Sequence, residues 1–290
     1  MRQPSAIEIT KTYPPRGPLN QYRLSSATSF QCFRCSEVKK SKLVAIYRGG
    51  WDKTLCNGRY GFLLSVWEIK AGQGDEGQKT DALAELLLKI YSENQIRELE
   101  RLYEVSEQRA KHVSDNTLRF VATSEHLAKQ MSPDLDWSPV VIGLCKAVET
   151  EIIVRFLRPL AKRLAGLSMS SDVQDKDMGR VAKFLAGNST TPPELGSFAH
   201  FLQTALNSTS RRDSSVLVSN MFQMLADWPR SDWPSDKNRL YVQLIELTRK
   251  FRNKAAHTDL LTQADYEACR ELVIGSQGML WKIAFSTQRF

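Results

Sequence analysis

The sequence has no apolar run long enough to cross a membrane. Its longest apolar stretches, residues 139–144 and 152–160, are flanked or broken by charged side chains such as Lys146 and Arg155. Both fall well short of the ~20 apolar residues that a membrane-spanning helix needs. No apolar segment follows the charged N-terminal residues, so we expect no secretory signal. We therefore expect a soluble, cytoplasmic protein with no membrane partner.

Cysteine is also scarce, and no other residue type is strongly enriched. Five cysteines in 290 residues, an odd number, argue against a disulfide framework. Only 15 Gly and 11 Pro are present, which excludes a collagen-like chain, and 42% hydrophobic with 25% charged residues is typical of globular proteins rather than disordered ones. No repeat of fixed period occurs. The length suits one large domain or two modest ones.

The positive charge of the chain is confined to its first quarter. The formal net charge is +8. Residues 1–70 contain twelve Lys and Arg but four Asp and Glu, whereas residues 71–290 contain 28 of each sign. A basic excess in one segment indicates an acidic partner for that segment, and nucleic acid is the commonest such partner. A basic surface that serves only solubility is the alternative.

Composition divides the chain into three segments. Residues 1–70 combine short apolar runs with Gly, Trp and Cys, which predicts a small α+β module resembling a zinc finger. Residues 71–130 begin with a polar, Gly-rich hinge over residues 71–79 and continue with Leu and Ile at three- and four-residue spacings. That spacing predicts one or two long amphipathic helices. The third segment covers residues 131–290.

The third segment predicts a helical domain, so the fold class we expect is mainly α, with a C-terminal helical bundle. A helix is expected over residues 140–164, kinked or interrupted by Pro159, because proline lacks the N–H of the helical hydrogen bond. A capping box at Thr262, with Asp265 in the usual place of Glu, announces the last long helix. Other helices are expected over residues 178–185, 194–206, 214–228 and 236–256.

Three of the cysteines have the spacing of metal ligands. Cys32 and Cys35 form a Cys-x2-Cys turn, from which two thiolates can reach one ion, and Cys56 follows after twenty intervening residues. This spacing resembles a zinc ribbon or treble clef, but the fourth ligand position holds Arg59, which cannot bind zinc. Three interpretations stay open: structural zinc with a fourth ligand such as Asp52, a water or a distant His; an empty finger held by its own core; or an accidental match.

Basic residues surround these cysteines and alternate with aromatic ones. Positive charge attracts phosphate, and rings such as those of Phe33, Tyr47 and Trp51 can stack on unpaired bases. The combination suits single-stranded or structured nucleic acid, although the rings could equally form the core of the module. The candidate nucleic-acid contacts in this segment are Lys39, Lys40, Lys42, Arg48 and Lys53.

The helix expected over residues 236–256 has a polar face opposite its core stripe. The stripe consists of Leu240, Leu244, Leu247, Phe251 and Ala255. At about 100° per residue, Asn253 and His257 point away from it, Arg249 and Lys250 widen the polar face as further candidate nucleic-acid contacts, and Arg252 flanks it. Histidine is the usual general acid or base, and a guanidinium suits phosphate. These groups fit RNA cleavage without a metal; the alternative is a solvated face with a chance histidine.

The segment from Arg252 to His257 resembles a family motif. Its sequence, Arg-Asn-Lys-Ala-Ala-His, resembles the Arg-Asn-x3-His form of the Arg-x4-His signature of HEPN domains. These all-helical modules occur in ribonucleases of toxin, antiviral and RNA-processing systems. Residues 139–149, 195–202 and 261–266 resemble further helices of the family, so the likeness covers residues 131–290. It implies a homodimer in which the faces over residues 249–257 meet and form one cleft.

The resemblance also implies roles for single residues and a function. His257 would be the general acid or base, Arg252 would stabilise the phosphate and Asn253 would orient it, with Lys146 and Glu149 as supporting residues. The implied function is a metal-independent endoribonuclease, an RNA-cleaving effector of a toxin or anti-phage defence system, restrained by a regulatory or antitoxin protein. The alternative is a catalytically inactive HEPN scaffold that binds nucleic acid or a partner protein.

Overall fold

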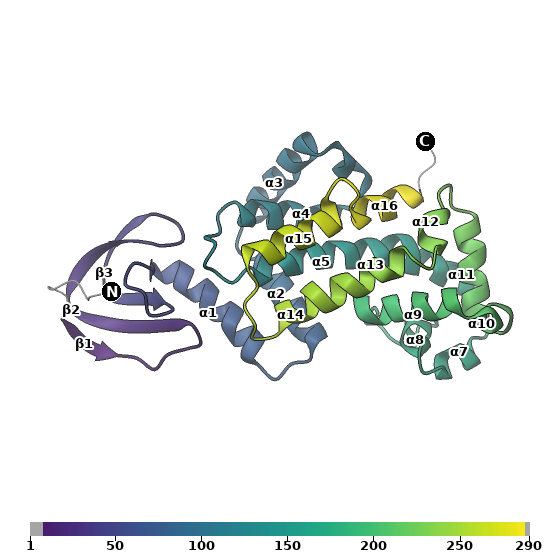
Figure 1. Ribbon diagram of the computed structural model, residues 1–290, viewed down its shortest axis with the longest axis horizontal. Coiled ribbons are helices and arrows are strands. Elements are labelled where there is room, and N and C mark those ends of the chain that lie inside the picture. Colours follow the sequence, from purple (N-terminus) through teal and green to yellow (C-terminus); the bar gives the residue numbers. More distant parts are fainter. Residues whose placement is uncertain (1–7, 288–290) are drawn as a thin grey trace.

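The computed structural model describes residues 8–287, which form an elongated molecule with a small sheet at one end and a larger helical body (Figure 1). The sheet is antiparallel, and its strands follow chain order. They are β1 (Ile9–Thr12), β2 (Leu19–Gln31), β3 (Val38–Tyr47) and β4 (Thr54–Leu55). The expectation of a mainly helical protein with a small N-terminal α+β module is thus confirmed at this level.

The sheet buries side chains on both of its faces, because successive residues of a strand point to opposite sides. On β3, Ala45 and Tyr47 pack toward Leu63 of α1 (Asn57–Ala71), whereas Val44 and Ile46 pack on the other face. The pairing of β2 with β3 shifts register between Arg23 and Thr28. Such a bulge bends the strand locally, and Figure 1 shows the curved strands.

Helix α1 leads from the sheet into the helical body (Figure 1). The Gly-rich stretch predicted as a hinge contains the connection over residues 72–75 and the start of α2, which an Asp75 and Gln78 capping box fixes. A second capping box, formed by Ser92 and Gln95, starts α3 where the hydrophobic spacing slips. Three α-helices therefore stand where one or two were expected: α2 (Glu76–Leu88), α3 (Glu93–Ser106) and α4 (Asp115–Ala128), with η1 (Gln108–His112) between the last two.

Helix α5 (Ser138–Ile152) is the buried centre of the body. It contacts α2, α4, α15 and α16, and its close approach to α4 depends on Gly143, where a Cβ would lie 1.9 Å from Ser124 Oγ. The helix continues through a π-helical segment, η2 (Ile153–Leu157), into α6 (Arg158–Leu164). The expected helix over residues 140–164 is thus present, and its wide turn ends just before Pro159, which cannot donate a helical hydrogen bond.

The remaining expected helices are present as well. Most of residues 236–256 form one long helical stretch, made of α13 (Leu240–Glu246), the π-helical η3 (Leu247–Arg252) and α14 (Asn253–Ala256). The Thr262 and Asp265 capping box starts α15 (Gln263–Ile274) as predicted. The others are α7 (Ser170–Gln174), α8 (Gly179–Leu185), α9 (Leu195–Asn207), α10 (Thr209–Ser214), α11 (Val216–Ala226), α12 (Asp232–Ser235) and α16 (Met279–Ser286). Within residues 8–287, the helices are all too short or too polar to cross a membrane.

A buried ion pair attaches the end of α1 to the helical body. Lys70 is 2% exposed, and its Nζ donates to Asp136 Oδ2 and Ser138 Oγ, both at 2.9 Å, and to the carbonyl oxygen of Asp259. These three bonds use all the donors of the ammonium group. Leu135, in the same loop as Asp136, packs into the core between the sheet and α1. The N-terminal module and the helical body therefore share a packed contact.

We expect Asp136→Ala to reduce the free energy of unfolding by about 3–5 kcal/mol, because it leaves the Lys70 ammonium buried without its anion. Asp134→Ala is the matched control, since the Asp134 pair with Lys53 at 2.8 Å is half-exposed and such pairs contribute little. Urea denaturation followed by circular dichroism measures both. Equal losses in the two variants would show that the buried pair is not the stronger attachment.

Candidate functional site

The polar face of the helix over residues 236–256 includes Asn253 and His257 but not Arg252. The predicted core stripe from Leu240 to Ala255 is buried, and Asn253 and His257 point away from it, as expected. Arg252, at the end of the π-helical η3, is only 3% exposed, because carboxylates from two other helices lie at its guanidinium. It therefore does not lie on the exposed polar face that it is expected to flank.

The buried guanidinium of Arg252 lies between two carboxylates. Its Nη2 is 3.0 Å from Glu194 Oε2 and its Nη1 is 3.8 Å from Glu76 Oε2. Nη1 also donates to Asn253 Oδ1 at 3.3 Å. Glu76 is the first residue of α2 and Glu194 is the N-cap residue of α9. Two anions offset the cost of burying one cation, and they join two helices that are distant in sequence.

His257 shares one of these carboxylates with Arg252. It directly follows α14, its side chain is 53% exposed, and its Nε2 lies 2.9 Å from Glu76 Oε1. One oxygen of Glu76 therefore faces Arg252 and the other faces His257. The structure thus brings Arg252, Asn253 and His257 together, and it adds two acidic residues to the cluster.

The two acidic residues were missed by sequence reasoning. Glu76 and Glu194 are distant from Arg252 along the chain, and nothing in their local sequence indicates which surface they face. One indirect signal exists at Gly77, where a Cβ would lie 2.9 Å from Glu194 Oε1. A glycine in the first turn of a helix, where it is unfavourable, can thus indicate that another group comes close.

The two supporting candidates, Lys146 and Glu149, form ion pairs outside the cluster around Arg252 and His257. Lys146 pairs with Glu149 on the same helix and with Asp81 of α2 at 2.9 Å. Burial disfavours the ammonium form, but the two carboxylates raise the pKa of Lys146 above its ordinary value. These pairs fix α5 to α2, the helix that carries Glu76. The supporting role of Lys146 and Glu149 therefore stays a prediction. In that role the two residues would act indirectly, by fixing the position of α2.

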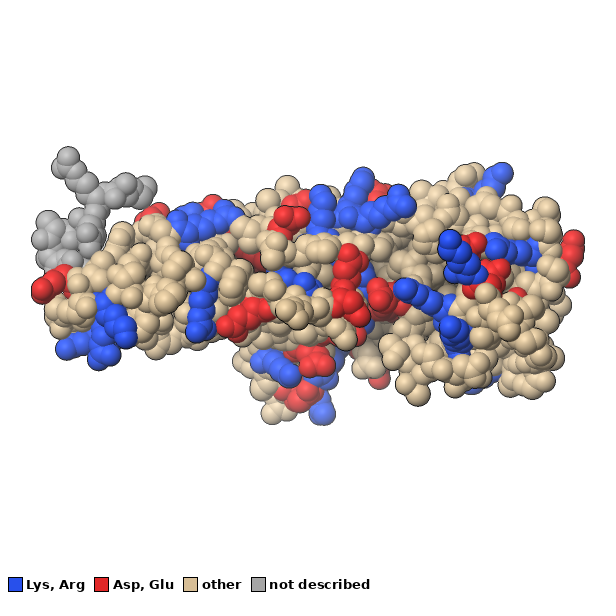
Figure 2. Space-filling model, turned by 90° about the horizontal axis from the view of Figure 1, so that it is seen from below, with Lys and Arg blue, Asp and Glu red and all other residues tan. Residues whose placement is uncertain are grey.

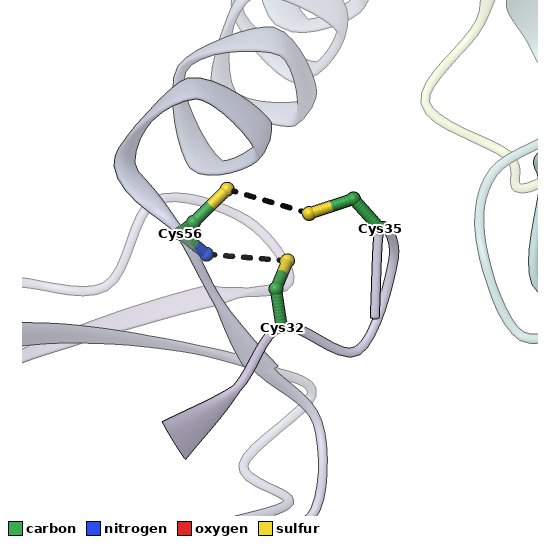
Figure 3. Close-up of side chains that lie close together, drawn as sticks. All are labelled: Cys32, Cys35 and Cys56. Atoms are coloured by element: carbon green, nitrogen blue, oxygen red, sulfur yellow. Dashed lines mark hydrogen bonds between the residues drawn. The ribbon is translucent and has the colours of Figure 1, made fainter. Parts of the chain in front are cut away.

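The three N-terminal cysteines come together at one end of the sheet (Figure 3). Cys32 follows β2, Cys35 lies in the next turn and Cys56 is the N-cap residue of α1. The Sγ atoms of Cys35 and Cys56 are 3.9 Å apart, and all three Sγ atoms lie within 4.8 Å of one another. Tetrahedral zinc with bonds of about 2.3 Å needs thiolate sulfurs about 3.8 Å apart, so the three thiols fit one metal ion after a small adjustment.

The backbone around these cysteines favours a thiolate at one of them. Burial disfavours the charged form of Cys32, but hydrogen bonds from the backbone N–H groups of Cys56, Cys35 and Arg34 outweigh it and lower the pKa of this thiol. The backbone nitrogen of Cys56 donates to Cys32 Sγ across 3.4 Å, and a dashed line marks this hydrogen bond in Figure 3. Burial raises the pKa of Cys56. Because thiolates are the metal-binding form, Cys32 is the best prepared ligand.

A fourth protein ligand is absent from this group. Arg59 lies on the first turn of α1, three residues after Cys56. Within the described part of the chain no other Cys, His, Asp or Glu joins the three thiols, so Asp52 does not complete the set. Three cysteines could hold zinc, with the fourth position left to a water or an external ligand.

The five candidate nucleic-acid contacts of the N-terminal module lie in two groups. Lys39, Lys40 and Lys42 are exposed near the start of β3, whereas Arg48 and Lys53 lie in the turn beyond its end. Lys39 pairs with Glu37 at 2.6 Å and Lys53 with Asp134. A nucleic acid that contacts all five would have to follow the length of the strand.

The aromatic residues of this module serve mainly in packing. Tyr47 is 1% exposed, and Trp51 stacks on Tyr22 with ring centroids 5.6 Å apart. Phe33 is partly buried, with Lys53 Nζ 5.5 Å from its ring centroid. For Tyr47 the structure therefore favours the core role over base stacking.

The helical body, which includes Arg249 and Lys250, carries less net positive charge than the N-terminal module. Arg249 and Lys250 are exposed on η3, and Lys250 pairs with Glu246 at 2.7 Å. Figure 2 shows basic and acidic side chains interspersed over the body on the face that it presents. This mixture agrees with the charge balance of residues 71–290 and offers no broad positive surface on that face.

We expect Arg59→Cys to tighten zinc binding by at least about tenfold, because it adds a fourth thiolate on the helix turn that follows Cys56. Competition with a zinc-responsive dye, and metal content after dialysis against a chelator, measure the change. The unaltered chain is expected to retain clearly less than one zinc per chain under the same dialysis. Cys269→Ala, which alters a buried cysteine far from the group, is the control, and an unaltered chain that retains a full equivalent of zinc contradicts the prediction.

Comparisons of this chain with known proteins found no match. No protein-family model, no curated protein and no solved structure matches it. The functional argument therefore depends on the chemistry of the residues that the fold brings together.

Proposed function

We propose that the chain is a metal-independent endoribonuclease whose reacting groups are His257 and Arg252. The observation that carries the proposal is the hydrogen bond between His257 Nε2 and Glu76, with about half of the histidine side chain open to solvent. A carboxylate that holds an imidazole fixes its tautomer and orientation. The remaining ring nitrogen, Nδ1, then serves as the general base toward a bound ligand.

The reaction that these groups suit begins with the 2′-hydroxyl of RNA. His257 accepts the 2′-hydroxyl proton while the 2′-oxygen forms a bond to the adjacent phosphorus. The bond from phosphorus to the 5′-oxygen then breaks, and that oxygen takes up a proton from a general acid. The products are a 2′,3′-cyclic phosphate and a 5′-hydroxyl. A base and an acid are both required, and a second copy of the chain that places its own His257 across a shared cleft supplies the second group.

Arg252 stabilises the charge on the phosphate in this proposal, and Asn253 orients it. The guanidinium has one close carboxylate partner, Glu194, and a looser one, Glu76, at 3.8 Å. A phosphate oxygen replaces the looser partner, since guanidinium groups bind phosphate and carboxylate with the same geometry. The exposed Arg249 and Lys250 add positive charge to the same face.

An effector of a toxin or anti-phage defence system is the setting we propose, with RNA as the substrate and a regulatory or antitoxin protein as the restraint. The support is the Arg-x4-His resemblance together with the clustering of its residues. Free ribonuclease activity would damage the cell that makes it, so such a protein needs a restraint.

A second function, an inactive scaffold that binds nucleic acid or a protein, is favoured by a different observation. Arg252 is 3% exposed and two carboxylates already neutralise it. A guanidinium in that state stabilises the fold, and the exposed lysines of β3 would then contact the partner. In the ribonuclease, a phosphate replaces Glu76 as a partner of Arg252. In the scaffold, Arg252 keeps both carboxylate partners.

We expect the purified chain to cleave RNA in the presence of EDTA, and His257→Ala to reduce the rate at least about a hundredfold through loss of the general base. Arg252→Ala is expected to have a similar effect, with Arg252→Lys as the variant that keeps the buried charge. His200→Ala is the matched control, because His200 is exposed on α9 away from the cluster. Gel analysis of labelled RNA measures the rates, and circular dichroism checks the fold.

Cleavage that survives His257→Ala would contradict the proposed mechanism. If the unaltered chain leaves RNA intact but binds it with an affinity that falls steeply with salt, the scaffold function is supported instead.

A further inference from the structure

A pocket of about 510 Å³ lies where the N-terminal module meets the helical body. One wall comes from the turn after β2 and the start of α1, and the other from residues 129–132, which follow α4. Its polar lining residues include Arg34, Ser36, Arg59, Lys129, Gln130 and Ser132. The pocket shares no residue with the cluster around Arg252 and His257.

Arg34 in this pocket is a buried cation with no carboxylate partner within residues 8–287, although the nearby thiols of Cys32 and Cys35 favour its charged form. It is 7% exposed, and its guanidinium carbon lies 4.5 Å from the ring centroid of Phe62. Among the residues that the structure describes, Nη2 has only the sulfur of Met131, at 4.0 Å, as a partner, whereas Nε and Nη1 are buried without any hydrogen-bond partner. Buried charges in proteins are normally paired and hydrogen-bonded. An unpaired guanidinium at a pocket wall therefore indicates a missing anionic partner.

Two further cations line the same pocket. Arg59 is partly buried and Lys129 is exposed. Burial, and then the charge of Arg59, lower the pKa of Arg34 to about 10, so the guanidinium stays charged at neutral pH. Glu37 also lines the pocket, but it pairs with Lys39 at 2.6 Å. The lining consequently carries an excess of positive charge.

We propose that this pocket binds the phosphate group of a nucleotide-sized ligand through Arg34, Arg59 and Lys129. A phosphate monoester carries a charge of about −1.5 to −2 at pH 7 and offers three strong acceptor oxygens, which suits three cations better than a single carboxylate does. Ser36, Ser132 and Gln130 supply neutral donors. The volume lies within the range of about 300–1,000 Å³ that is usual for small-molecule sites.

Occupation of the pocket has a structural consequence. Arg34 and Arg59 belong to the N-terminal module, whereas Lys129 belongs to the helical body. A phosphate that contacts both sides links them, and a ligand that binds only the folded chain stabilises it. This role does not depend on ribonuclease activity.

Isothermal titration calorimetry of the full chain at constant ionic strength tests the proposal, with inorganic phosphate, adenosine 5′-monophosphate and adenosine as separate probes. We expect phosphate and the monophosphate to bind and adenosine not to bind. Lys129→Ala and Arg59→Ala are each expected to weaken binding by about tenfold, because each removes a charge-assisted contact. Lys183→Ala on α8, an equal charge change at an exposed site, is the control.

These variants avoid replacing the buried Arg34, whose loss could affect folding. Tighter binding of the monophosphate than of phosphate identifies a nucleotide as the ligand, and equal binding identifies free phosphate. The proposal is overturned if neither phosphate probe binds. It is also overturned if both bind Lys129→Ala and Arg59→Ala as tightly as they bind the control, which would point to general charge attraction or to a metal at the cysteines.

Discussion

The buried ammonium group of Lys70 joins helix α1 to two other segments of the helical body. It lies at the end of α1, and its three hydrogen bonds go to Asp136 just before α5, to Ser138 at the start of α5 and to the backbone of Asp259. Glu76 begins α2 six residues after Lys70, and His257 lies two residues before Asp259. A single buried cation thus holds both chain segments that supply the pair between Glu76 and His257. The geometry of the candidate site follows from this attachment.

Local patterns in the sequence predicted most of the helical elements. The capping box at Thr262 and Asp265, the core stripe from Leu240 to Ala255 and the position of the last long helices were all confirmed. Each depends on residues within a few turns of one another, where hydrogen bonding and hydrophobic spacing act locally. The Cys-x2-Cys turn likewise predicted that three thiols meet, although not whether a metal binds.

Long-range contacts could not be predicted in this way. The burial of Arg252 depends on Glu76 and Glu194, which come from other helices. The separation of Lys39 from Arg48 along β3 depended on the strand being ten residues long. Both the burial of Arg252 and the separation of the basic residues depend on the three-dimensional path of the chain.

The extra residue in the turn over residues 247–252 has a consequence for how this helix could change. A π turn holds more residues than an α turn, so deleting one residue there would restore regular α-helical spacing while the segments before and after it keep their facing. His257, beyond the turn, would still face Glu76, and Leu244, before it, would stay in the core. The π turn is therefore the place where this helix can change in length without displacing the histidine.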